Sequence, residues 1–207
     1  IVFLVVSAPP LLSAQSPYLP LNEDYYHRLD RYEIKSGKLY SEIFTAVKPY
    51  KRSDAVAFID SVNADGLISS RADEFNYNYL RNDSWEWARP ETNESKRPIL
   101  NTFYKKKSDL FYVDIPEFDL HVNPILYVGA GSDSRLDDLL MLNTRGVEVR
   151  GMVDRKVGFY TMLTDNQMIL PAHARDYVSQ YFVVPHEGFW KAFKDTGVDF
   201  LQARGYI

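Results

Sequence analysis

The chain has 207 residues, of which 45% are hydrophobic and 14% aromatic, and its formal net charge at pH 7 is -4. This length supplies one or two hydrophobic cores, and the charge balance gives no basis for binding nucleic acid. The absence of cysteine excludes disulfides, thiolate metal sites, a cysteine nucleophile and a lipoprotein anchor. The 15 tyrosines are typical of proteins that place aromatic rings at a membrane interface or a sugar site.

An apolar stretch opens the sequence, from Ile1 to Ala8, and leads into a segment of proline and small residues that ends at Gln15. This pattern is typical of the hydrophobic region and cleavage zone of a signal peptide, with the best cleavage position after Ala14. A buried strand is the alternative interpretation. No stretch reaches the ~18 apolar residues that a spanning helix requires. Residues 1–14 are therefore expected to be a signal-peptide remnant, and any membrane crossing is expected to use strands.

Residues 15–97 are expected to form a small helical unit that ends in a linker. Apolar spacing and N-cap residues predict helices over 23–35 after Asn22, over 54–62 after Ser53, and over 71–82 after Ser69 or Ser70. Residues 38–47 are expected to be a short extended piece. Residues 89–97 carry several charges and Pro90, a composition typical of a linker. The charges of this unit show no catalytic arrangement and are interpreted as solvated faces.

The sequence changes character after residue 98, where period-two alternation predicts strands over 110–115 and 118–130. On the second strand one face is apolar and the other polar, and the two sets are Phe118, Leu120, Val122, Pro124, Leu126 and Val128 against Asp119, His121, Asn123 and Tyr127. Proline cannot donate to a ladder, so a bulge or an unpaired site is expected at Pro124.

The clearest pattern lies within residues 143–167 and predicts a hairpin. Valines and a glycine alternate with polar residues up to Val153, three charged residues interrupt the pattern, and alternation resumes at Val157. The predicted register pairs Val153 with Val157, Gly151 with Phe159, Val149 with Thr161, and Val147 with Leu163. An aromatic ring across a strand glycine is a device that sets register in curved sheets. The charged residues Arg145, Glu148 and Arg150 are expected to form ion pairs.

Two explanations fit a hairpin with one apolar and one partly charged face. In a soluble sandwich or barrel, the valines would pack on a core. In an outer-membrane barrel, the valines would face lipid and the charged residues a wet lumen. A hairpin cannot stand alone in water, so more sheet must surround it.

The remaining segments predict connections and further strands. Residues 129–142 and 165–174 are expected to be loops, 177–184 a strand or part of a long loop, 187–194 a short amphipathic helix, and 197–207 a final strand. About six strands follow residue 108, which is fewer than the ~8 of the smallest membrane barrel. The sequence is therefore expected to be truncated at both ends.

Several short motifs occur in a specific order and spacing along most of the chain after Gln15. They include Tyr26-His27-Arg28-Leu29-Asp30, Lys48-Pro49-Tyr50-Lys51-Arg52, Val122-Asn123-Pro124, Asn143-Thr144-Arg145-Gly146, Lys156-Val157-Gly158-Phe159-Tyr160 and Thr164-Asp165-Asn166-Gln167. With these motifs the chain resembles the capsule assembly protein Wzi family, in its Bacteroidetes-type form.

The resemblance implies a mainly β fold with a small α unit. An N-terminal helical periplasmic unit (15–97) would be followed by the first antiparallel strands of an outer-membrane β-barrel (98–207, a partial transmembrane barrel). It also implies a lectin-like protein of the cell outer membrane, exported by a signal peptide, that attaches or organises capsular or extracellular polysaccharide. Its partners would be that polysaccharide and outer-membrane lipid. No site residue is transferred from the family.

The sequence offers little support for catalysis or cofactors. The four histidines, at 27, 121, 173 and 186, lack the spacing of a metal site. The acidic pairs Asp137-Asp138 and Asp114/Glu117 are interpreted as solvated acids rather than the carboxylates of a glycosidase. No phosphate-binding loop and no nucleophile elbow is present. We therefore expect no metal, no cofactor and no enzymatic activity.

Two further functions remain as alternatives to the lectin-like barrel. One is a porin-like solute channel with the same barrel, and the other is a soluble periplasmic sugar-active enzyme. Short turns of outer-membrane barrels lie on the periplasmic side. The turn 154–156 is therefore expected there, and 129–142 and 165–177 outside the cell.

Sugar would be held where aromatic rings, which cover the apolar face of a pyranose, lie beside acids and amides. Residues 173–190 are the richest in such groups, and the candidate residues are Asp176, Tyr177, Gln180, Tyr181 and Trp190, with His186 nearby. Tyr177 and Tyr181 are favoured, because their hydroxyls suit a wet surface. The alternative is that Phe189, Trp190 and Phe193 only pack a loop helix against the barrel.

Overall fold

The computed structural model describes residues 16–21 and 23–207. The predicted signal-peptide remnant (1–14) and the predicted N-cap Asn22 lie outside the described residues. Within the described part, no helix is both long and apolar enough to cross a membrane.

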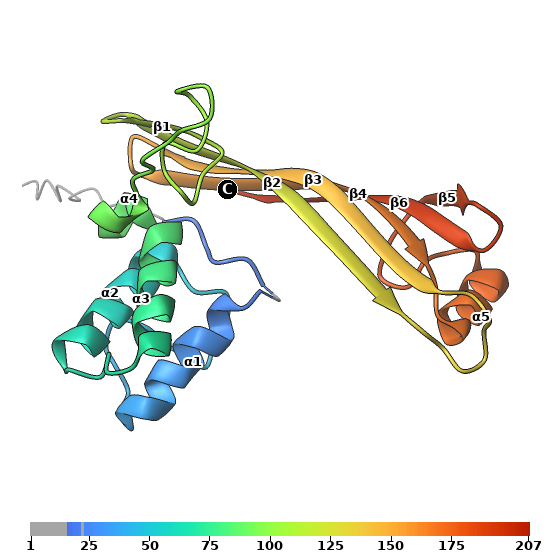
Figure 1. Ribbon diagram of the computed structural model, residues 1–207, viewed down its shortest axis with the longest axis horizontal. Helices are drawn as coiled ribbons and strands as arrows, with labels where there is room; N and C mark the ends of the chain where they lie inside the picture. The colour runs from blue at the N-terminus through green and yellow to red at the C-terminus, as the bar shows by residue number, and fades with distance from the viewer. Residues whose placement is uncertain (1–15, 22) are drawn as a thin grey trace, which may run out of the picture.

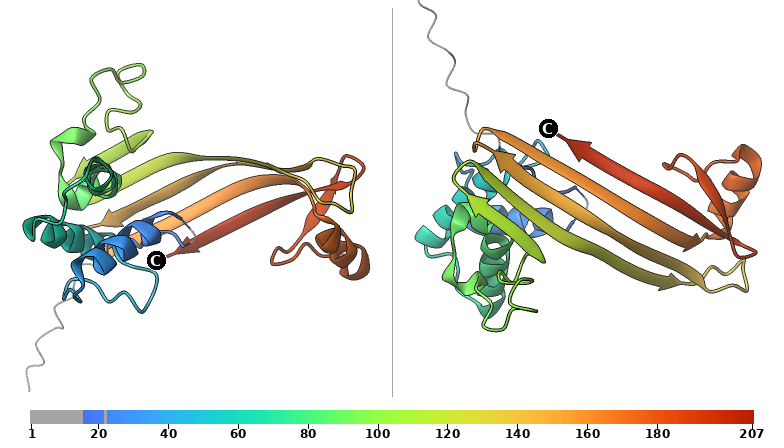
Figure 2. Two further views of the ribbon diagram at one scale, coloured as in Figure 1. Left: turned by 60° about the horizontal axis from the view of Figure 1, so that its bottom comes forward. Right: turned by 90° about the horizontal axis from the view of Figure 1, so that it is seen from above.

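A long twisted sheet dominates the molecule, with helices against the same face at its two ends (Figure 1). The six strands are antiparallel in the order β1-β2-β3-β4-β6-β5, and the sheet is open. The strands are β1 (Phe111–Ile115), β2 (Phe118–Gly131), β3 (Leu140–Val153), β4 (Val157–Ile169), β5 (Trp190–Phe193) and β6 (Gly197–Tyr206). The views in Figure 2 show β2, β3, β4 and β6 running side by side along its length.

The helical unit lies at the end of the sheet where the turns 116–117 and 154–156 are located. Its elements are α1 (Tyr25–Ser36), α2 (Arg52–Ala64), α3 (Arg71–Asp83), α4 (Trp85–Ala88) and the short 3-10 helix η1 (Glu91–Asn93). Apolar side chains at helical spacing, including Leu29, Tyr32, Phe58 and Ile59, are fully buried together. A small core of this kind is what makes the helices stable, because isolated helices of this length are marginal in water.

The caps of these helices were predicted in part. Of the two predicted N-caps of α3, Ser70 is the one used, and it forms a capping box with Asp73. Ser53 is not an N-cap, because α2 begins one residue earlier, at Arg52, and the Ser53 hydroxyl donates to Asp54 instead. Residues 38–47 form turns and bends rather than an extended piece.

The hairpin of β3 and β4 has the predicted register. Val153 pairs with Val157, Gly151 with Phe159, Val149 with Thr161 and Val147 with Leu163, and the pairing continues to Met141 and Ile169. The predicted loops 129–142 and 165–174 are therefore shorter than expected, since both strands extend into them. The ladder between β2 and β3 is continuous through Pro124, so the expected bulge is absent there. Pro124 lies beyond the end of the β1–β2 ladder, at an edge, where proline is tolerated.

Two predictions near the end of the chain were wrong. Residues 177–184 were expected to be a strand or loop, but most of them belong to α5 (Ala172–Tyr181). Residues 187–194 were expected to be a helix, but Trp190–Phe193 is β5, paired with β6. Val178 and Ala174 of α5 pack on Val198 and Phe200 of β6, and this small core decides both assignments.

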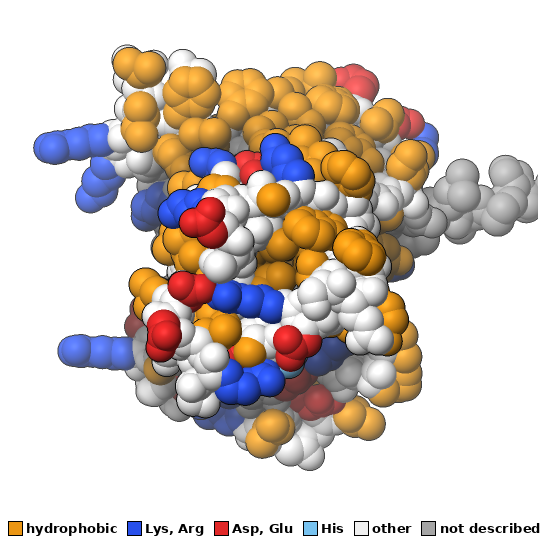
Figure 3. Space-filling model, turned by 90° about the vertical axis from the view of Figure 1, so that its right-hand side faces the viewer, with side chains coloured by type: hydrophobic (Ala, Val, Ile, Leu, Met, Phe, Trp, Pro, Cys, Tyr) orange, Lys and Arg blue, Asp and Glu red, His pale blue; other side chains and the backbone are white. Residues whose placement is uncertain are grey.

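One face of the sheet carries the helices and buries polar residues beside the helical unit and apolar residues beside α5, while the opposite face exposes apolar residues. On the face that carries the helices, His121, Arg150 and Met152 are only 1–2% exposed. On the opposite face Leu126 and Val128 are each 78% exposed, and Val147, Val153, Val157, Leu163 and Leu201 are exposed as well. Figure 3 shows this opposite face at the top of the view, covered by hydrophobic side chains. We call it the outer face, and the helix-bearing face the inner face.

Candidate functional site

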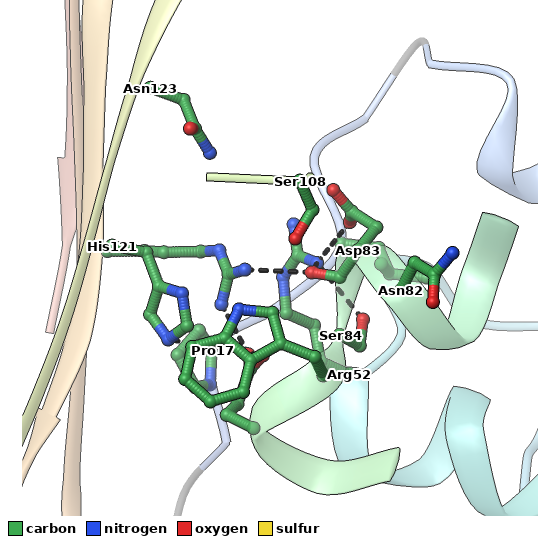
Figure 4. A network of polar contacts seen from close by, with 12 residues as sticks. Pro17, Arg52, Asn82, Asp83, Ser84, Ser108, His121 and Asn123 are labelled. Atoms are coloured by element: carbon green, nitrogen blue, oxygen red, sulfur yellow. Dashed lines mark hydrogen bonds and ion pairs between the residues drawn. The ribbon is translucent and has the colours of Figure 1, made fainter. Parts of the chain in front are cut away.

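A buried network of charged residues joins the helical unit to the inner face of the sheet. The Arg150 guanidinium, which extends from β3, pairs with Glu86 of α4 and donates to the backbone oxygen of Asp83 at 2.8 Å. Arg52 of α2 reaches Asp83 from the other side and donates to the Ser84 hydroxyl at 3.0 Å. Figure 4 shows His121 on its strand near Arg52, Asp83 and Ser84 of the helical unit.

Asp109, just before β1, is the second centre of this network. Its carboxylate contacts Nδ1 of His121 at 2.8 Å and accepts hydrogen bonds from the Asn123 amide at 3.0 Å and from the indole N–H of Trp85. Burial raises the pKa of Asp109, but the hydrogen bond with His121 and the charge of Arg150 outweigh it and hold this pKa well below its usual range. The carboxylate therefore stays ionised at neutral pH.

Opposite charges in this network nearly balance, and each charged group has a partner. Asp83 is buried, which raises its pKa, yet the Arg52 and Arg150 guanidinium groups lower it overall. Charges removed from water require such pairing, because an unpaired buried charge costs several kcal/mol, on the order of 3–5. The network fastens the helical unit to the sheet through the Arg150–Glu86 pair, while Nε2 of His121 and Oε2 of Glu86 face each other at 3.9 Å without a hydrogen bond.

The charged residues of the hairpin were predicted to form ion pairs on one face. Arg150 does so, with Glu86, and Glu148 on the same face accepts a long hydrogen bond from Tyr160 at 3.4 Å. Arg145 lies on the outer face instead, because its odd number places it with Val147 and Val149. It pairs with Asp165 across the hairpin, with an N···O distance of 3.0 Å, in a row of the outer face where Leu126 and Leu201 are the neighbouring partners.

The favoured sugar candidates lie together on α5, at the end of the sheet far from the helical unit (Figure 1). Tyr177 and Tyr181 are one helical turn apart, with exposed side chains and ring centroids separated by 4.7 Å. Asp176 and Gln180 flank them and are also exposed. We call these four residues the α5 face. It brings two rings, a carboxylate and an amide to one solvent-exposed surface.

Trp190 does not belong to the α5 face. Its indole N–H donates to the backbone oxygen of Phe182 at 3.0 Å, and its ring packs against the core beneath α5. The packing interpretation therefore holds for Trp190, although on a strand rather than on the predicted helix. Phe189, by contrast, is 89% exposed.

The other candidate groups are dispersed. Asp138 pairs with Arg175 at 2.8 Å, and Asp114 with Arg155 at 3.2 Å. In the described part of the chain, no group of three His, Asp or Glu side chains is arranged to hold a metal ion. His121 is the histidine with a clear role, inside the buried network.

Reasoning from the sequence missed the buried network. Its members come from positions as far apart as 52, 86, 109 and 150, and a single charged residue carries no local signal of its distant partner. The alternation of β2 is the one local signal, because it turns Asp119, His121 and Asn123 to one face and so predicts polar contacts there.

Comparisons of the chain with family models, with curated proteins and with solved structures find no match.

Proposed function

We propose that the chain is part of an outer-membrane β-barrel that holds capsular or extracellular polysaccharide at the cell surface. In this proposal the six strands are one portion of a closed barrel, the outer face contacts lipid, and the inner face lines the lumen. The helical unit lies in the periplasm, and the protein binds sugar without catalysing a reaction. The family resemblance of the sequence motifs supports this proposal.

The observation that carries the membrane part is the inverted polarity of the sheet. Water-soluble sheets bury their apolar face, since burial stabilises by about 25 cal/mol per Å². Here the apolar face is exposed along β2, β3, β4 and β6, while arginine, histidine and aspartate are buried on the other. Contiguous exposed apolar surface of this extent is typical of contact with lipid or with another protein. Strands that alternate apolar-out and polar-in are typical of membrane barrels.

The polysaccharide part is supported by the α5 face. Tyrosine pairs beside acids and amides suit a sugar, because the rings cover C–H groups and the polar groups accept hydroxyl protons. The α5 face also lies at the end of the sheet opposite the short turns, which is the extracellular end of an outer-membrane barrel.

The test of this part is the double substitution Tyr177→Ala/Tyr181→Ala in the full-length protein. Loss of two contacts of about 1 kcal/mol each predicts roughly tenfold or greater weakening of polysaccharide binding. Retention of polysaccharide on cells and binding of the purified protein to it are the measurements. Phe189→Ala is the control, because it removes an aromatic ring that is even more exposed but lies outside the α5 face. Unchanged retention in the double variant at normal surface levels would remove the α5 face from the proposal.

A porin-like channel is distinguished by conductance. The helical unit packs on the inner face and is held there by Arg150, which pairs with Glu86 and donates to the backbone oxygen of Asp83, so we expect it to obstruct the lumen. Planar-bilayer recordings of the full-length protein should show no large open channel. Large, stable conductance would instead favour solute transport.

A further inference from the structure

The loop between η1 and β1 has a surface that the proposed function does not use. It spans residues 94–110, and in Figure 1 it rises beyond the β1 side of the sheet, above the level of the strands, while α1, α2 and α3 lie below. Bridges between Glu94 and Lys106 and between Ile99 and Phe103 order it. The backbone N–H groups of Ile99 and Phe103 each donate to the other residue's oxygen, both at 2.9 Å. The tip is therefore a hydrogen-bonded turn of defined shape.

This turn presents apolar side chains to the surroundings. Ile99 is 56% exposed and Leu100 82% exposed. Leu100 and Asn101 also have φ angles of 51° and 56°, in the left-handed region that residues other than glycine rarely adopt. In water, packing of the Leu100 side chain would not offset the cost of this backbone conformation. An apolar environment around the tip would explain why leucine is held there.

Basic residues surround the tip. Residues 96–107 contain Lys96, Arg97, Lys105, Lys106 and Lys107 and no acidic residue. Within the described chain Lys106 pairs with Glu94, and Lys107 donates to the backbone oxygen of Thr92 at 2.5 Å. Lys96, Arg97 and Lys105 are exposed and are available to bind an anion.

We propose that this loop docks on the surface of a bilayer that contains anionic phospholipid. Ile99 and Leu100 enter the layer below the headgroups, and Lys96, Arg97 and Lys105 contact headgroup phosphates. Charge complementarity carries the choice of partner, because a polybasic segment beside an anionic leaflet gains about fivefold in affinity per basic residue. The loop protrudes from the rest of the molecule (Figure 1), which suits insertion into a fluid layer. Val113 and Ile115 of β1 lie on the outer face and adjoin this loop. The loop proposal therefore rests on the membrane contact of the outer face that is proposed above.

The experiment uses variants of the full-length protein that carry a single cysteine at a chosen position, and residues 1–207 contribute no other cysteine. Leu100→Cys, labelled with an environment-sensitive dye, is incorporated into vesicles of phosphatidylcholine with or without phosphatidylglycerol. Ser134→Cys, on an exposed loop at the other end of the sheet, is the matched control. A label on Val147→Cys shows separately whether the outer face contacts lipid.

The Leu100 label should move to an apolar environment and resist a water-soluble quencher when phosphatidylglycerol is present, whereas the Ser134 label should not. The triple variant Lys96→Glu/Arg97→Glu/Lys105→Glu should abolish the effect of phosphatidylglycerol. Should that variant fold poorly, Lys96→Gln and Arg97→Gln should each reduce the preference for phosphatidylglycerol about fivefold.

A Leu100 label that stays in water in both kinds of vesicle, while the Val147 label is in lipid, would overturn the loop proposal and leave the barrel intact. A Leu100 label that enters lipid equally with and without phosphatidylglycerol would overturn the role of the basic residues. If the Val147 label stays in water, the barrel proposal itself fails.

Discussion

Gly151 occupies a position in β3 where no side chain fits. A Cβ atom built on it would lie 2.2 Å from the backbone oxygen of Asp119 and 2.9 Å from the ring of Phe159. Gly151→Ala should therefore destabilise the protein by about 1–3 kcal/mol, the usual cost of overpacking. Denaturant titration measures this loss. Gly131→Ala is the control, since its nearest neighbour would lie at an ordinary 3.8 Å, and equal stability of the two variants would contradict the prediction.

Arg150 and Arg145 come from the same strand, but their substitution should lower the stability of the protein by very different amounts. Arg150→Met leaves Glu86 and Asp109 buried without their cation, which should cost about 3–5 kcal/mol. Arg145→Met removes only an exposed pair with Asp165 and should cost less than about 1 kcal/mol. Adding Glu86→Gln to Arg150→Met should recover part of the loss. A similar midpoint for both single variants in denaturant would refute the role of the buried network.

At the scale of elements, the start of α3 couples stability to pH. Two hydrogen bonds lower the pKa of Asp73 well below its usual range, and the one from Lys35 has a larger effect than the one from Ser70. A carboxyl group with a lowered folded-state pKa stabilises above its unfolded value of about 3.9 and loses that contribution as pH falls below it. Denaturant unfolding, monitored by circular dichroism at several pH values from neutral to acid, should show this loss of stability. The Asp73→Asn variant should be less stable than the parent protein at neutral pH, and its stability should fall less on acidification. An unchanged acid profile would contradict it.

The exchange of helix and strand at α5 and β5 has a physical explanation. Tyr177 to Val184 contains valine, tyrosine and phenylalanine, which are common in strands, and Glu187 to Lys194 has an aromatic stripe at helical spacing. Local preference is weak in both segments. Val178 and Ala174 bury themselves on β6 only as parts of a helix, and Trp190 pairs with Phe200 only as part of a strand. Tertiary packing overrode the local pattern.

At the scale of the whole molecule, the two ends of the sheet differ in a way that predicts topology. The turn 154–156 lies at the same end as the helical unit, and the loop 132–139 lies at the other end with α5. In cells that express the full-length protein, a membrane-impermeant thiol reagent should label Ser134→Cys but not Arg155→Cys. Labelling in permeabilised cells shows that both cysteines can react. The reverse pattern in intact cells would mean that the orientation is inverted.

The sequence by itself determined the helical unit, the long strands β2, β3, β4 and β6, and the register of the central hairpin. These features depend on neighbours close in the chain: alternation assigns each side chain to a face, and the charged turn 154–156 sets which residues pair. The grouping of Tyr177 with Tyr181 also follows from local spacing, once the segment is a helix.

Only the tertiary structure decided which face of the sheet is covered, how the helical unit is attached, and what Trp190 does. Arg150 pairs with Glu86 across 64 positions in the chain, and Asp109 meets His121 and Trp85 only after the linker folds back onto β2. Such contacts have no local signature, because a charge is paired or solvated according to what folding brings beside it. Alternation predicted two unlike faces, and the position of the helices determined that the polar one is buried.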